Sequence, residues 1–211
     1  MTIYIFLVLI LLFILVILFW FNKRKIPQEK GELENNNNDS TNLVLLIAIS
    51  SVMMALGALL KVFGIMLTPN MRISFFALPL MLTGLICGME YSILTAIGAD
   101  LIYSLFSGYA FNPAFTLSAV YWGILGGIFK ILKDKNHLNF FAIFLGILIT
   151  SLLETHTNLL VTYMLYGTYT TIASLITKYI VLIIKLPLLA LLLYGINKRV
   201  IDKINILRSI K

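Results

Sequence analysis

Long apolar runs, interrupted by short polar segments, cover most of the chain. One run extends from Ile3 to Phe21, and six more follow a polar stretch. We expect these six to be helices at 42–66, 74–89, 91–107, 114–132, 138–165 and 172–197. About 20 apolar residues are enough to cross the hydrocarbon layer as a helix. The runs lack the alternation of apolar and polar residues that is typical of barrel strands. A helix satisfies its backbone N–H and C=O groups by hydrogen bonds within the same segment. The pattern therefore predicts an all-α membrane protein, a six-helix bundle preceded by one extra N-terminal transmembrane helix.

The polar stretch after the first apolar run differs from the rest in composition. It contains the run ENNNN together with Lys, Glu, Pro and Ser, and has too few apolar residues to form a core. The first run has no preceding positive charge and no small-residue cleavage site, so we interpret it as a retained anchor. The predicted segments are an anchor helix at 1–22, a disordered cytoplasmic linker at 23–41, a six-helix membrane domain at 42–199 and a basic cytoplasmic tail at 200–211.

The basic residues give the expected orientation in the membrane. Hydrophobic residues make up 60% of the chain, and its net charge is +7. Most Lys and Arg residues fall in three groups, at 23–30, 130–135 and 198–211. These groups lie on the same side of the membrane if every predicted helix crosses the bilayer. The positive-inside rule makes that side cytoplasmic. We therefore expect a multi-pass protein of the cell membrane with its N-terminus outside and its C-terminus in the cytoplasm. Basic residues beside the lipid bilayer explain the charge without a nucleic acid partner.

Few residues are suited to metal or redox chemistry. Cys87 is the only cysteine, which excludes an internal disulfide and a thiolate cluster. His137 and His156 are too far apart for a zinc-binding HExxH helix. We expect no metal site, no cofactor and no metalloenzyme activity.

Four basic residues remain once the three groups are set aside: Lys61, Arg72, Lys178 and Lys185. Each lies within a predicted helix or at its outer end. A charge near the bilayer centre costs about 2.5–3.5 kcal/mol on insertion scales, so such residues usually face a cavity or a partner. Counting along the helices puts Lys185 and Asp100 near the midplane. We expect these two to be candidates for one buried pair, which either fixes the helix packing or contacts a ligand.

The same count places Lys61, Arg72 and Lys178 in the outer half of the membrane. Glu154 is the acidic residue expected there, so three cations against one acid favour an anionic ligand. The alternative for Lys61 and Arg72 is that their long side chains reach out to lipid phosphates.

The predicted helix at 138–165 carries a polar face. Glu154, Asn158, Thr162 and Tyr166 follow one another at intervals of four. Their side chains form hydrogen bonds either with a heteroaromatic ring or between helices of the bundle. Aromatic residues near the outer rim suit stacking on such a ring, although an interfacial belt or core packing is the alternative. They are Phe75, Tyr109, Phe111, Trp122 and Tyr166.

The predicted helix at 42–66 carries a seam of small residues. Ala48, Ser51, Ala55 and Ala58 recur at heptad-like spacing. Small residues let membrane helices approach closely, so the seam serves either a partner subunit or internal packing.

Five segments match, in order and spacing, a known family of membrane proteins. They are PNMRISFFALP from Pro69, GADLIYSLF from Gly98, FNPAFTLSA from Phe111, NLLVTYMLYG from Asn158 and KYIVLIIKLPLL from Lys178. With these segments, residues 42–199 resemble the folate-specific substrate-binding subunit, or S component, of energy-coupling factor (ECF) transporters. The resemblance implies the S-component bundle for the six-helix part.

The resemblance also implies a function and partners. The subunit would capture folate, or a related anionic pterin, at the outer face and dock on a transmembrane coupling subunit driven by two ATPase subunits. The chain itself has no GxxxxGKS or GxxxxGKT motif, as expected for a subunit that binds no ATP. The family's AxxxA docking pattern corresponds here to Ala48, Ser51, Val52 and Ala55. Residues that we expect to bind the substrate are Lys61, Arg72, Ser74, Phe75, Tyr109, Phe111, Asn112, Glu154, Asn158, Tyr166 and Lys178.

Other functions remain open at this point. An S component for riboflavin, thiamine or a queuosine precursor would have the same architecture. Thiamine is disfavoured because a cation is repelled by the outer cations. An intramembrane enzyme would use Glu154, His156 and Asp100, but Glu154 and His156 point in nearly opposite directions on a helix. A structural membrane protein without a ligand would leave the outer cations unexplained.

Overall fold

The computed structural model describes the backbone of residues 36–68, 71–107 and 111–201. The chain divides into two units, residues 1–41 and 42–211, of which the second contains nearly all described residues. The predicted anchor helix at 1–22, most of the linker, and nearly all of the basic tail lie outside the described residues.

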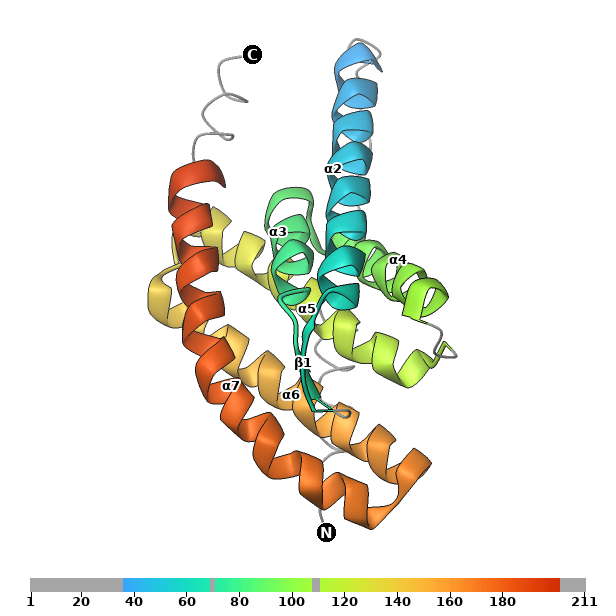
Figure 1. Ribbon diagram of the computed structural model, residues 1–211. Coiled ribbons are helices and arrows are strands. Elements are labelled where there is room, and N and C mark those ends of the chain that lie inside the picture. The colour runs from blue at the N-terminus through green and yellow to red at the C-terminus, as the bar shows by residue number, and fades with distance from the viewer. Residues whose placement is uncertain (1–35, 69–70, 108–110, 202–211) are drawn as a thin grey trace, which may run out of the picture. The chain divides into compact units, whose positions relative to one another are not determined.

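Six α-helices follow one another in the described part of the chain (Figure 1). They are α2 at Asn36–Val62, α3 at Ala77–Cys87, α4 at Met89–Ser107, α5 at Pro113–Asp134, α6 at Phe140–Tyr166 and α7 at Thr168–Ile196, which continues into the π-helical segment η1 at Asn197–Ile201. These helices correspond one to one to the six predicted from the apolar runs. The helical class of the membrane domain is therefore confirmed, while the seventh helix stays a prediction.

A short hairpin interrupts the helical pattern between α2 and α3. Strands β1, Ile65–Thr68, and β2, Met71–Ile73, pair antiparallel, with Ile65 opposite Ile73. The expectation that a helix extends to residue 66 is wrong, because α2 ends at Val62. Gly64 disfavours continuation of the helix, and the Pro69-Asn70 dipeptide favours a turn in the sequence that follows. The first of the matched sequence segments begins in this hairpin and ends in α3.

α3 is short and lies in the centre of the bundle. Its 11 residues are nearly all buried, and it packs directly against α5. Gly84 of α3 meets the backbone of Gly126 and Gly127 on α5, with no space for a side chain. The chain then reverses at Gly88, whose φ of 108° is in the range that favours glycine, and α4 follows at once. Small residues thus allow the close approach of helices that membrane bundles depend on.

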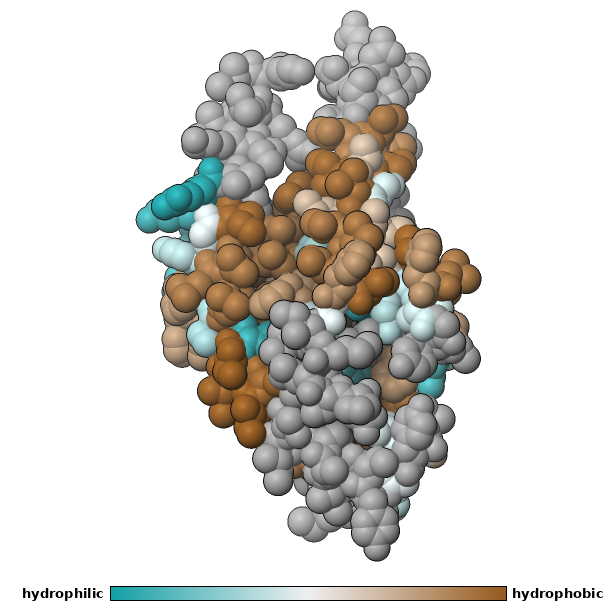
Figure 2. All heavy atoms as spheres, viewed as in Figure 1, coloured by the Kyte–Doolittle hydropathy of each residue, from teal (hydrophilic) through white to brown (hydrophobic). Residues whose placement is uncertain are grey.

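The core and the outer surface are both apolar, as expected in a lipid bilayer. Trp122, Phe129, Ile147 and Leu189 are among the largest fully buried side chains. Figure 2 shows hydrophobic residues covering the described surface over α2. Within the described part of the chain, four helical stretches are long and apolar enough to cross a membrane: Leu43–Val62, Pro113–Asp134, Phe140–Met164 and Lys178–Arg199. The chain is therefore a membrane protein with several apolar helices, and the orientation of its termini stays a prediction.

Candidate functional site

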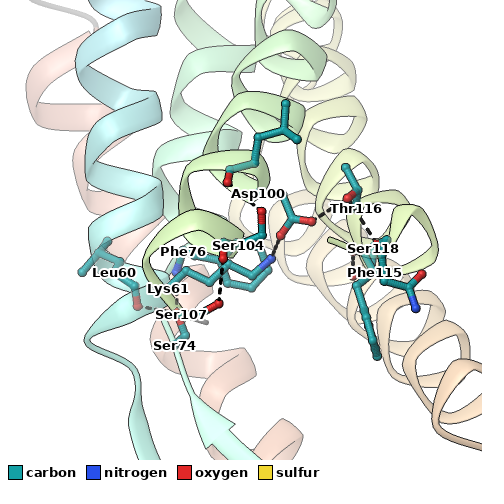
Figure 3. A network of polar contacts seen from close by, with 12 residues as sticks. Leu60, Lys61, Ser74, Phe76, Asp100, Ser104, Ser107, Phe115, Thr116 and Ser118 are labelled. Carbon is teal, nitrogen blue, oxygen red and sulfur yellow. Dashed lines mark hydrogen bonds and ion pairs between the residues drawn. The ribbon is translucent and has the colours of Figure 1, made fainter. Parts of the chain in front are cut away.

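Lys61 forms a buried ion pair that joins three helices. It lies in the last turn of α2 and is only 8% exposed. Its Nζ donates to Oδ1 of Asp100 on α4, and the Thr116 hydroxyl of α5 donates to Oδ2 of the same carboxylate at 2.5 Å (Figure 3). One carboxylate thus receives a charged and a neutral donor, which compensates the loss of water around it.

Aromatic rings surround the Lys61 ammonium. Its Nζ lies 5.1 Å from the ring centroid of Phe76 and 5.0 Å from that of Tyr103. A cation at this distance is attracted by the negative face of an aromatic ring. Lys61 is therefore held by a carboxylate and by rings, and the alternative that it reaches out to lipid phosphates is wrong.

A second network involves Glu154 on α6, whose carboxylate also lies near one neutral donor and one ammonium. The indole Nε1 of Trp122, on α5, donates to Oε2 of Glu154 at 3.0 Å. Lys185 of α7 lies 3.8 Å from the same oxygen. The Lys185 ammonium is also 5.5 Å from the Trp122 ring and 5.7 Å from the Phe76 ring. Both lysines therefore approach Phe76, which lies just before α3.

The two expected members of one buried pair, Asp100 and Lys185, have different partners in the structure. Asp100 pairs with Lys61 and not with Lys185, so the expected pair is wrong. Asp100 is in the second half of α4, towards Ser107, and Lys61 is at the end of α2. Among the described side chains, three lysines, Lys61, Lys178 and Lys185, thus stand near two carboxylates.

Ser74 links the hairpin to α2. Its hydroxyl donates to the backbone oxygen of Leu60 at 2.6 Å and accepts from the backbone N–H of Phe76 at 3.3 Å (Figure 3). These bonds fix the segment that carries Phe76 beside the end of α2. Phe75, the neighbouring ring, is partly buried and packs against the core. The structure therefore gives Ser74 a positioning role, and direct contact of Ser74 or Phe75 with a ligand stays a prediction.

Asn112 caps the start of α5. Its side-chain oxygen accepts from the backbone N–H of Ala114 at 3.0 Å, which satisfies one of the free donors of the first turn. Phe111, the preceding residue, is 44% exposed. The cap sets where Thr116 lies on α5, and thus contributes to the Asp100 network.

Asn158 and Lys178 are near the Glu154 network but are not used by it. Oδ1 of Asn158 is buried and has no hydrogen-bond partner among the described residues. Lys178 is half-buried and lies within range of the Glu154 charge. His156 is exposed, and its ring contacts Tyr179 instead of Glu154 or Asp100. The three residues of the proposed enzyme site thus have separate partners.

Some predicted site residues fall outside what the structure describes. Tyr109 is not described at all, and the side chains of Arg72 and Tyr166 are not described either. Their roles stay predictions. Conversely, the sequence did not single out Phe76, Tyr103 or Thr116 as site residues. Phe76 is adjacent to Phe75 in a matched segment, and Thr116 follows the Asn112 cap by four residues, which puts it one turn inside α5.

The expected docking residues lie on an open face of α2. Ala48, Ser51, Val52 and Ala55 are all exposed, whereas Ala58, the last member of the small-residue seam, is buried. Ala58 therefore serves internal packing. The other three members, Ala48, Ser51 and Ala55, form together with Val52 an exposed strip on α2.

Comparisons with known proteins agree with this architecture. The family model described as "ECF transporter, substrate-specific component" matches residues 43–198. The crystal structure of FolT bound with folic acid has 25% sequence identity to this chain and a TM-score of 0.62. The match covers 70% of this chain and 91% of FolT. A search among curated protein sequences finds no match.

The family match spans almost the whole six-helix part, including both carboxylate networks and the hairpin. Members of this family are substrate-binding parts of transporters and not enzymes, and they work with coupling and ATPase modules. The chain belongs to the family of substrate-specific components of ECF transporters.

Proposed function

We propose that this S component captures folate, or a closely related anionic pterin, at the outer face of the membrane. It then delivers the vitamin across the membrane together with a coupling subunit and two ATPase subunits. The observation that carries the proposal is the approach of Lys61 and Lys185 to one ring, Phe76, in a fold that is similar to folic-acid-bound FolT.

The chemistry of the site suits a flat heteroaromatic ligand with negative charge. Phe76 and Trp122 offer ring surfaces, and stacking on aromatic faces is a common way to hold such a ring. Three lysines against two carboxylates leave the described site with excess positive charge. Thiamine, a cation, is repelled by this excess, and riboflavin, which is uncharged, does not use it.

A ligand screen on the purified protein tests the proposal. Folic acid is expected to raise the thermal unfolding midpoint, because a ligand that binds only the folded state stabilises it by about 2.7 kcal/mol at a concentration of 100 times Kd. Riboflavin and thiamine are the matched arms of the screen. The proposal is abandoned if folic acid gives neither a thermal shift nor a calorimetric signal while riboflavin gives both.

The exposed strip on α2 is proposed as the docking surface for the coupling subunit. Replacement of Ala55 by Trp would place a bulky indole ring on this strip, where the close approach of another helix needs small residues. Ala55→Trp is expected to reduce co-purification with the coupling and ATPase subunits at least tenfold, with folic acid binding unchanged. The control is Ile183→Trp on α7, at a position that is 71% exposed and outside the strip. Equal recovery of the complex with both variants would contradict this docking surface.

A further inference from the structure

Among the described side chains, Glu154 faces two ammonium groups, whereas Asp100 faces one. Lys185 is 3.8 Å from Glu154, and Lys178 lies within range of the same charge. Lys178 precedes Lys185 by seven residues, which is two turns of α7, so both are on one face. Among the described residues, no hydrogen bond or ion pair holds the Lys178 ammonium. One positive charge in this part of the bundle is therefore left without a partner of its own.

Asn158 adds an unused acceptor in the same stretch of the bundle. α6 and α7 pack against each other and are joined by Gly167 alone, so they form a helical hairpin (Figure 1). The contact between His156 and Tyr179 fixes their register. Asn158 follows Glu154 by four residues and so lies on the same face of α6, and Lys178 lies within range of the Glu154 charge. Both lie between the Glu154–Lys185 pair and the turn at Gly167.

The Asn158 oxygen and the Lys178 ammonium require different partners. A buried amide oxygen without a donor is costly, and proteins rarely keep one without a reason. The same holds for a half-buried ammonium within a membrane-spanning segment. The oxygen needs an N–H or O–H donor, and the ammonium needs an anion. A carboxylate attached through an amide N–H offers both.

We propose that Asn158 and Lys178 form a subsite for the amide-linked carboxylate end of the ligand. This inference rests on the proposed folate function. The ring of the ligand is placed at Phe76 and Lys185, and the carboxylate end at Lys178. Seven residues of α7 separate the two lysines, which is about 10 Å along the helix axis. The subsite therefore selects folate over pterins that have no charged tail.

The test compares folic acid with its dimethyl ester, which has the same shape but no carboxylates. The wild-type protein is expected to bind folic acid about tenfold or more tightly than the ester, by calorimetry. Lys178→Met is expected to remove this preference, so that the two compounds bind equally. Lys198→Met, an exposed lysine at the end of the bundle, is the control and should keep the full preference.

Asn158→Leu tests the other half of the subsite. It is expected to weaken both compounds about tenfold, because both retain the amide N–H. The ligand-free variant should unfold at the same temperature as the wild type or higher, since it loses only an unpaired buried oxygen. A residue that merely supports the fold would lower that temperature.

The outcomes separate the two levels of the proposal. If folic acid does not bind the wild-type protein, the proposed function fails. If folic acid binds, but the wild type shows no preference over the ester or Lys178→Met keeps the preference, only the subsite is overturned. An Asn158→Leu variant with wild-type affinity likewise removes Asn158 from the subsite.

Discussion

Lys61→Met is expected to destabilise the ligand-free protein by about 3–5 kcal/mol, the usual cost of removing one partner of a buried ion pair. The substitution leaves the Asp100 carboxylate, in a residue that is 5% exposed, with the Thr116 hydroxyl as the remaining donor that the structure shows. It also removes a cation from between the rings of Phe76 and Tyr103. Unfolding by a denaturing detergent, followed by circular dichroism without ligand, measures the effect on stability alone.

A double-mutant cycle identifies the ion pair as the cause. Asp100→Asn alone is expected to be destabilising as well, because it removes the carboxylate that pairs with the Lys61 ammonium. Lys61→Met combined with Asp100→Asn should be more stable than the sum of the two single losses predicts, since neither charge is then unpaired. Lys198→Met, at an exposed position, should stay within about 0.5 kcal/mol of the wild type. Additive losses in the cycle would show that the pair contributes nothing of its own.

The number and order of the helices could be predicted because apolar runs of this length have few other structures in a membrane. The hairpin could not. Its first strand, Ile65–Thr68, is as apolar as the end of α2, so hydrophobicity alone does not separate them. Gly64 is the residue in the sequence that indicates the end of α2, but one glycine by itself does not predict a hairpin.

The ion pairs were harder to predict than the helices. Counting residues gives the depth of a side chain in the membrane, but not the direction in which its helix face points or which helices are neighbours. Asp100 and Lys185 were assigned similar depths, yet Asp100 faces α2 and α5, and Lys185 faces α6.

The identity of the central aromatic ring depends on the same kind of detail. The sequence predicts a helix from residue 74, whereas α3 begins at Ala77. Ser74 and Phe75 therefore precede the helix, with the Ser74 hydroxyl bonded to the Leu60 backbone oxygen, and Phe76 rather than Phe75 meets both lysines. Motif matching identifies such a segment, and the local hydrogen bonds decide which of its side chains enters the site.

The two carboxylate networks share a backbone support. Both neutral donors, Thr116 and Trp122, come from α5, and α5 packs directly on α3, which follows Phe76. The geometry of the site thus depends on the distance between α3 and α5. That distance is set where Gly84 meets Gly126 and Gly127, about two turns after Phe76 on the α3 side and about one turn after Trp122 on the α5 side.

Gly84→Ala is therefore expected to affect both stability and binding. A Cβ at Gly84 would lie 2.4 Å from the backbone carbon of Gly126, and backbone atoms cannot rotate away. The loss of stability should be at the upper end of the about 1–3 kcal/mol typical of overpacking, and folic acid affinity should fall because Phe76 moves with α3. Gly195→Ala on α7 is the control, since nothing lies within 4 Å of its Cβ and alanine favours a helix. Detergent unfolding and calorimetry measure both effects, and similar stability of the two variants would show that α3 and α5 are not held at contact distance by these glycines.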